Sequence, residues 1–150
     1  MQIFKVRDMN FKTNLTNKIL SDLDEYLDST IKQNVINNLS KSIYFTAQSE
    51  YGFNGFISLL DEGEILKIDF IGIFKTFTRQ KTGKTLINAA IDFARGNKKK
   101  ALVVTIKDDL SGDINYLKTR RFFTKMGFVK LATINSNEFF NPALVMGYIL

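Results

Sequence analysis

A chain of 150 residues, of which 45% are hydrophobic and 24% charged, predicts one globular domain that spans residues 1–150. It has no cysteine and no apolar run near the roughly 18 residues of a membrane helix, which excludes disulfide scaffolds and helical membrane proteins and favours the cytoplasm. The net charge of +6 fits either an anionic cofactor or nucleic acid.

Hydrophobic periodicity predicts helices and strands along the whole chain. Apolar residues recur every four positions from Leu15 to Leu39, which is typical of a helical face, and Asp28-Ser29-Thr30 divides this stretch into two helices. Residues 51–55 carry a hairpin signal. In chain order, the expected elements are a strand at 2–7, two helices within 14–39, strands at 42–49, 53–60 and 65–73, a helix at 86–93, a strand at 101–106, a helix at 116–126, and strands at 128–134 and 143–150. This order predicts an α/β fold with a mixed sheet.

The stretch Gln80–Thr85 lies between an apolar strand and a helix, which is the arrangement of an anion-binding loop. The first N–H groups of a helix lack partners, and the helix dipole adds partial positive charge there. Gly83 would let the backbone approach a phosphate closely, and Arg79, Lys81 and Lys84 add positive side chains. We therefore expect a phosphate-bearing ligand here, although solvated surface lysines would give the same pattern.

The chain contains neither histidine nor cysteine. This removes Ser-His-Asp and Cys-His nucleophile pairs and the usual zinc sites, so that no metal is expected. Acid–base chemistry must then rely on Asp, Glu, Tyr, Lys, water or the backbone. The composition favours direct transfer between two positioned reactants over a covalent intermediate.

Asp69 interrupts the apolar strand Ile65–Ile73, which otherwise reads as buried on both faces. A carboxylate in such a strand is costly unless it is paired or functional, and burial would raise its pKa toward that of a useful base. Asp69 is therefore a candidate base or anchor for a substrate ammonium. The alternative is an ion pair with a neighbour such as Lys67, or a partly exposed strand end.

Two motifs and the order of elements carry a family resemblance. The loop Gln80-x-x-Gly83-x-Thr85 and the helix end Arg121–Phe128 are similar to the Gln/Arg-x-x-Gly-x-Gly/Ala loop and the aromatic-aromatic-x-Lys-x-Gly-Phe segment of the GNAT superfamily. Members of this superfamily are N-acetyltransferases that pass the acetyl group of acetyl-CoA to an amine. The segments Asn115–Phe123 and Asn141–Met146 further resemble small bacterial members. The resemblance covers residues 62–150 by motif and the first sixty residues by element order.

The resemblance implies a mixed, mostly antiparallel sheet of six or seven strands, flanked by about four helices, with a splayed central pair of strands at 65–73 and 101–106. The implied co-substrate is acetyl-CoA, whose pantetheine arm would pair with the first of these strands and whose pyrophosphate would sit on the loop. Thr85 departs from the family pattern, and its side chain would either crowd the cofactor or bond a phosphate. The implied cofactor-binding residues are Ile71, Gly72, Ile73, Arg79, Gln80, Lys81, Thr82, Gly83, Lys84, Thr85 and Phe123.

The resemblance also bears on the acid and the base. Asp69 lies eleven residues before Gln80, where histone-type members carry a catalytic glutamate. Many members place a tyrosine beside the departing thiolate, but this chain has Phe123 there, which cannot donate a proton. Tyr116, seven residues earlier on the same helix face, could supply a hydroxyl or could simply pack. Release of CoA as a thiolate without a dedicated acid is the third alternative.

The expected function is transfer of an acetyl group from acetyl-CoA to a primary amine of a small molecule or peptide. A homodimer is one possible assembly. Four acidic residues of the first helical region, Asp22, Asp24, Glu25 and Asp28, would suit a cationic acceptor, although helix surfaces are usually charged. One alternative is a non-catalytic acyl-CoA-binding or regulatory protein. A nucleic-acid-associated module is supported by charge alone, because the run Lys98–Lys100 reads as a solvated helix cap.

Overall fold

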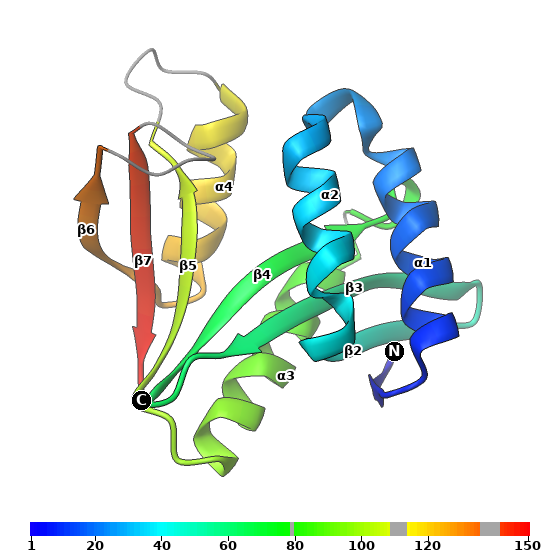
Figure 1. The fold of residues 1–150 in the computed structure, drawn as a ribbon, viewed down its shortest axis with the longest axis horizontal. Coiled ribbons are helices and arrows are strands. Elements are labelled where there is room, and N and C mark those ends of the chain that lie inside the picture. The colour runs from blue at the N-terminus through cyan, green and yellow to red at the C-terminus, as the bar shows by residue number, and fades with distance from the viewer. Residues whose placement is uncertain (79, 109–113, 136–141) are drawn as a thin grey trace.

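A mixed sheet in the order β1-β2-β3-β4-β5-β7-β6 forms the centre of the computed structural model, and all seven strands lie in the described part of the chain (Figure 1). The structure describes residues 1–78, 80–108, 114–135 and 142–150. The strands are β1 (Gln2–Val6), β2 (Ile43–Ser49), β3 (Gly52–Asp61), β4 (Ile65–Ile73), β5 (Ala101–Lys107), β6 (Val129–Ile134) and β7 (Ala143–Ile149). Among these described strands, β4 and β5 pair in parallel and the other neighbours pair antiparallel.

Four helices flank this sheet in the described residues. They are α1 (Met9–Asp22), α2 (Ser29–Asn38), α3 (Thr82–Gly96) and α4 (Ile114–Lys125), with short 3-10 turns η1 (Asp24–Tyr26), η2 (Leu39–Lys41) and η3 (Lys75–Phe77). Figure 1 shows α1 and α2 in front of β2–β4, and α3 and α4 behind the sheet. The predicted order of helices and strands is confirmed, and so is the mixed, mostly antiparallel sheet. The 3-10 turns were not predicted, because three residues carry too little periodicity.

Two hydrophobic clusters hold the layers together. One lies between the sheet and α1 and α2, where the rings of Tyr44 and Phe56 stack with centroids 4.8 Å apart. The larger cluster lies between the sheet and the helices behind it, and it includes Leu86 and Ile87 of α3 and Phe123 of α4. The apolar residues of α3 therefore pack against the face of the sheet that is opposite to α1 and α2.

An aspartate caps the start of each of the first two helices. The Asp28 side chain accepts a hydrogen bond from the Ile31 N–H at 2.8 Å, so the predicted division at residues 28–30 is confirmed. The first helix begins at Met9, five residues before the predicted start at Asn14, because Asp8 caps it. The missed turn contains Lys12, which is 5% exposed and donates from Nζ to the Leu39 and Ser42 carbonyls. Because a lysine occupies this buried position, the apolar periodicity does not extend into the first turn of α1.

The predicted turn at residues 51–55 is too long and lies too far along the chain. The turn occupies Glu50 and Tyr51, and Gly52 starts β3 with φ of 115°, a conformation that favours glycine. Asn54 and Gly55 lie inside β3 instead. A Cβ on Gly55 would come within 2.5 Å of the Gly72 carbonyl oxygen, so this glycine permits close backbone approach.

Two lysines of the basic run Lys98–Lys100 contact the turn between β3 and β4. Lys99 donates to Asp61 at 2.7 Å and to the Gly63 carbonyl at 2.6 Å, and its side chain is 13% exposed. Lys100 pairs with Glu64 at 3.0 Å on the surface. The predicted solvated cap is therefore corrected for Lys99, which fastens the start of β5 to the β3–β4 turn. Among the described helices, none has the length and apolar character needed to cross a membrane.

Candidate active site

Strand β4 is irregular at Asp69. On the β3 side, Phe70 pairs with Ser58 and Ile68 pairs with Leu59, which leaves Asp69 without a partner among the described strands. This is a β-bulge, a feature that bends a strand and re-aims a side chain, often next to an active site. The parallel ladder with β5 also ends at Ile68. Asp69 is thus both the bulged residue and the first residue past the parallel ladder.

Beyond this point β4 and β5 diverge (Figure 1). The pairing between them covers Ile65–Ile68 and Ala101–Val104, whereas β4 continues to Ile73. The β5-facing edge of residues 69–73 therefore has no strand partner in the described part of the chain. A free edge of this kind accepts an extended chain by backbone hydrogen bonding, which fits the expected role of Ile71, Gly72 and Ile73.

A cavity of about 390 Å³ lies where the two strands diverge. Its walls come from β4, β5, α2, the η1 region and α4, so elements from both halves of the chain meet there. The apolar part includes Ile31 and Val35 of α2, Val104 and Ile106 of β5, and Phe70. Pockets of this size and mainly apolar lining are typical of small-molecule sites.

Asp69 lines this cavity and keeps one oxygen free. Asn38 Nδ2 donates to Asp69 Oδ1 at 3.2 Å, while Oδ2 is buried without a hydrogen-bond partner among the described residues. Burial raises the pKa of the Asp69 carboxyl above its usual range, and the Asn38 hydrogen bond and the charges of Lys67 and Lys41 oppose this rise only in part. The alternative of an ion pair with Lys67 does not form within 4.0 Å in the described structure.

Tyr116 and Phe123 of α4 line the same cavity. Tyr116 is half-buried, and Lys107 Nζ lies 4.9 Å from the centroid of its ring. Phe123 is 2% exposed and makes edge contacts with Phe122 and Phe128. Tyr116 and Phe123 are seven residues apart on α4, and both therefore line the same cavity, as predicted.

The predicted anion loop forms the start of α3. Lys81 adopts φ of 61° just before the helix, and no side chain caps this helix in the described residues. Lys81 and Lys84 are exposed, as is Gln80, whereas Thr82 and Gly83 are buried. Uncapped N–H groups and two exposed ammonium groups suit a phosphate. Arg79 lies outside the described residues.

Gly83 and Thr85 have local structural roles as well. A Cβ on Gly83 would lie 3.1 Å from the Phe122 ring and 3.3 Å from Ile73 Cδ1, so glycine lets α3, α4 and the end of β4 meet. The Thr85 hydroxyl donates to the Lys81 carbonyl at 2.9 Å, which uses its proton inside the helix. None of the described residues 80–85 lines the cavity, but the free edge of β4 leads from Asp69 to Ile73 beside Gly83.

The four acidic residues near the first helices are already engaged. Asp22 accepts from the Lys75 N–H at 2.8 Å, Asp24 pairs with Lys32, and Glu25 pairs with Lys75. Asp28 caps α2, and it alone of these four lines the cavity. They hold the α1–α2 connection and η3 in place, so the expected acidic rim for an acceptor is largely a structural feature.

Sequence reasoning missed Asn38, and also Asn34, which lines the cavity. Both asparagines lie one position before a buried apolar residue, which is Val35 of α2 and Leu39 of η2. Polar amides repeating at four-residue spacing beside an apolar stripe were the available signal. Within the described residues, no group of three or more Asp, Glu, His or Cys side chains is placed to hold a metal ion.

Comparisons with known proteins bear on the family and the fold. The sequence model described as the acetyltransferase (GNAT) family matches residues 14–128. No curated protein sequence matches the chain significantly.

Three solved structures have similar folds over 99% of this chain. A Bacillus subtilis acetyltransferase in complex with CoA has a TM-score of 0.75 at 16% identity, with 98% of that chain covered. The aminoglycoside 6'-N-acetyltransferase from Enterococcus faecium has a TM-score of 0.71 at 15% identity, with 97% covered. The ribosomal-protein-S18-alanine N-acetyltransferase from Escherichia coli has a TM-score of 0.72 at 12% identity, with 92% covered.

Proposed function

Because the chain belongs to the acetyltransferase (GNAT) family, we propose that it transfers an acetyl group from acetyl-CoA directly to a primary amine held in the cavity beside Asp69. One observation carries this proposal. The bulged Asp69, with its free Oδ2, lies where the unpaired edge of β4 begins. A base is thereby placed next to a backbone edge that can hold an extended thioester arm.

Binding of acetyl-CoA would use two neighbouring features. The free edge at Ile71–Ile73 offers backbone N–H and C=O groups, and the uncapped start of α3 offers N–H groups beside Lys81 and Lys84. A free N–H of this edge would also stabilise negative charge on the thioester carbonyl oxygen during attack. The solved fold with CoA bound, from Bacillus subtilis, supports CoA as the ligand class.

Asp69 would take the proton that the substrate ammonium must lose before its nitrogen attacks. A carboxylate becomes a better base near neutral pH when its pKa is raised, and burial raises that of Asp69. Asn38 Nδ2 donates to Oδ1 at 3.2 Å, so the buried Oδ2, which has no hydrogen-bond partner among the described residues, is the oxygen that would receive the proton. Because Asp is short, the proton would move through one water molecule.

The leaving thiolate of CoA needs a proton or must depart charged. Phe123 cannot supply it, and its packing among aromatic rings explains why an apolar residue suits that position. Tyr116 is half-buried and lines the same cavity, and we propose its hydroxyl as the acid.

Titration of the purified protein with acetyl-CoA by calorimetry tests the binding half of the proposal. Release of CoA thiol with a panel of primary amines tests the catalytic half, and the chain has no cysteine to react with the thiol reagent. We expect saturable binding and amine-dependent thiol release. No binding at millimolar acetyl-CoA would overturn the proposal, and binding without turnover of any amine would favour the non-catalytic acyl-CoA-binding alternative.

A further inference from the structure

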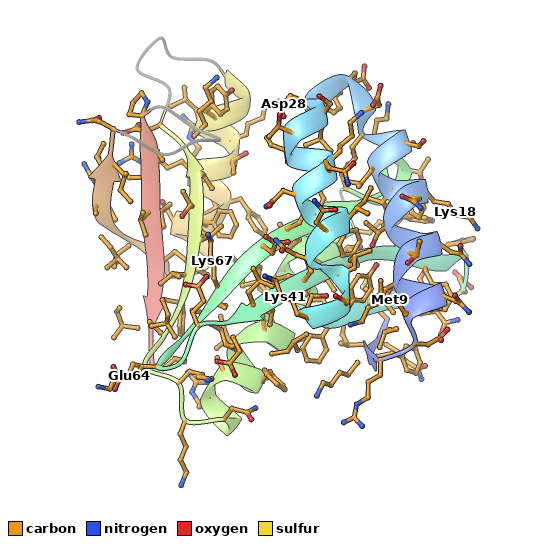
Figure 2. The ribbon with its side chains drawn as sticks, in the orientation of Figure 1. Met9, Lys18, Asp28, Lys41, Glu64 and Lys67 are labelled. Carbon is orange, nitrogen blue, oxygen red and sulfur yellow. The ribbon has the colours of Figure 1, made fainter. Side chains whose placement is uncertain are left out.

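The cavity contains opposite charges in a mainly apolar enclosure. Asp69 presents a buried oxygen without a hydrogen-bond partner among the described residues. Lys67, two residues earlier on β4, lines the same cavity and is half-buried. Within the described part of the chain, its ammonium forms no ion pair and no side-chain hydrogen bond. Lys67 pairs with Val103 in the β4–β5 ladder, and Figure 2 labels it where β4 runs beside β5.

The placement of these two residues suits a small zwitterion. Residues two apart on a regular strand have Cα atoms about 6 to 7 Å apart, and the bulge at Asp69 bends β4 within this interval. An α-amino acid carries its ammonium and its carboxylate on the same carbon, so both groups can reach side chains at that separation. Resting on the proposed function, we propose that the acceptor is a free α-amino acid, whose ammonium binds Asp69 and whose carboxylate binds Lys67.

The other walls define the side chain of this acceptor. Ile31 and Val35 from α2 and Val104 and Ile106 from β5 surround the charged pair with apolar surface. A second cation, Lys107, lies over the Tyr116 ring at the far wall. A polyamine or aminoglycoside would bring further ammonium groups toward Lys67, which like-charge repulsion disfavours. Asp28, the other carboxylate of the lining, already accepts a hydrogen bond from the Ile31 N–H at 2.8 Å as the cap of α2. An aliphatic or aromatic amino acid fits better than a polycation.

The transfer step balances with these groups. The substrate ammonium gives one proton to Asp69, and the neutral nitrogen forms a C–N bond to the acetyl carbonyl while the C–S bond to CoA breaks. The second nitrogen proton leaves as the amide forms, and the thiolate takes one proton, from Tyr116 or from water. The products are an N-acetyl amino acid and CoA, with one proton released to solvent. Lys67 takes part in binding and not in proton transfer.

Paired substrates test the role of the carboxylate. Thiol release would be measured with leucine and phenylalanine, with leucinamide and phenethylamine, which lack the carboxylate, and with the polycation tobramycin. We expect kcat/KM for the two amino acids to exceed that for their carboxylate-free partners by about tenfold or more, which is the size of one hydrogen bond between charged groups. Tobramycin should be the poorest acceptor.

Variants of Lys67 test whether this residue causes the preference for acceptors that carry a carboxylate. In Lys67→Gln the preference should fall to near one while turnover of leucinamide persists, and Lys67→Arg should retain it. Lys18→Gln removes an exposed charge on α1 and should leave the preference unchanged. Thermal unfolding and acetyl-CoA titration of each variant would show that it is folded and still binds the co-substrate.

The outcomes separate this inference from the proposed function. Equal or better turnover of the amides or of tobramycin, or a preference that survives Lys67→Gln, would overturn the zwitterion inference and leave the acetyltransferase proposal standing. Binding of acetyl-CoA without acetylation of any amino acid would overturn the inference as well. Absence of acetyl-CoA binding would overturn the proposed function itself.

Discussion

Replacement of Asp69 by asparagine should change activity and stability in opposite directions. The variant keeps the shape of the side chain and can still bond Asn38, which contacts Oδ1 at 3.2 Å. It cannot accept the substrate proton. Because general-base catalysis contributes about 100-fold to 10,000-fold, we expect kcat for the best amine to fall by about 100-fold or more, with acetyl-CoA binding unchanged.

Stability should rise because the wild-type carboxylate is held at a cost. Its Oδ2 is buried without a partner among the described residues, and burial raises its pKa. An unsatisfied buried polar group costs about 1 to 3 kcal/mol. The variant leaves a neutral amide in the same place, so we expect the low end, about 1 kcal/mol of gain near neutral pH. For a chain of 150 residues that gain is a rise in Tm of about 2 to 4 °C.

The gain should depend on pH with a defined sign. A carboxyl whose pKa is raised by folding destabilises the folded state when it is ionised, and this effect is absent below its ordinary pKa. The stability difference between variant and wild type should therefore shrink as the pH falls into the acidic range, where the wild-type side chain is protonated. The difference should grow as the pH rises through the raised folded-state pKa of Asp69, and it should be largest above that pKa.

Two measurements check this reasoning, namely thiol release with acetyl-CoA and an amine, and thermal unfolding followed across pH. Asp92→Asn is the matched control, since that side chain is 81% exposed on α3 and should change neither. Turnover in Asp69→Asn within a few-fold of wild type would remove Asp69 as the base. A clear fall in Tm at neutral pH would show that the carboxylate is compensated in the folded state, contrary to the free Oδ2.

Three further substitutions probe the surroundings of this carboxylate. Asn38→Ala removes a hydrogen bond that lowers the pKa of Asp69, so the acidic limb of the pH–rate profile should move to higher pH; an unmoved limb would assign it to another group. Tyr116→Phe should lower kcat by about 100-fold without changing acetyl-CoA affinity if its hydroxyl protonates the thiolate, and an unchanged kcat would mean that CoA leaves without this acid. Gly83→Ala should lower Tm by about 2 to 4 °C and raise KM for acetyl-CoA, because its Cβ would lie 3.1 Å from Phe122 and overpacking costs about 1 kcal/mol. Gly96→Ala in the same helix has no described atom within 4 Å of the new Cβ and should not lower Tm.

The family and the order of elements were readable from the chain because both depend on local pattern. The four-residue spacing between Leu15 and Leu39 and the aspartate at 28 define two helices without reference to the rest of the molecule. The strand at 65–73 was predicted with the bounds that the structure has. The anion loop could also be placed, since glycine and lysines before a helix have a local meaning.

The predictions from local sequence pattern were wrong where a residue makes a contact with a distant part of the chain. Asn54-Gly55 looks like a turn, yet Gly55 is needed for the approach of the Gly72 carbonyl on the next strand. Lys12 looks like a surface residue, yet it is buried against two carbonyls about thirty positions along the chain. In each case, a contact with a residue far away in the sequence explains the residue type, and hydrophobic periodicity does not show such a contact.

By itself, the sequence determined the order of the main helices and strands, because spacing along one helix or strand follows from backbone geometry. An aspartate within an apolar strand made Asp69 a candidate, and the resemblance of two motifs gave the family and the candidate Tyr116. The tertiary structure decided that these two side chains line one cavity with Lys67, and that Asn38 holds Asp69 from 31 positions away. It also decided the bulge and the end of the β4–β5 ladder at Ile68. These features depend on how α2 and α4 pack against two strands, and such contacts between distant segments leave no periodic trace in the chain.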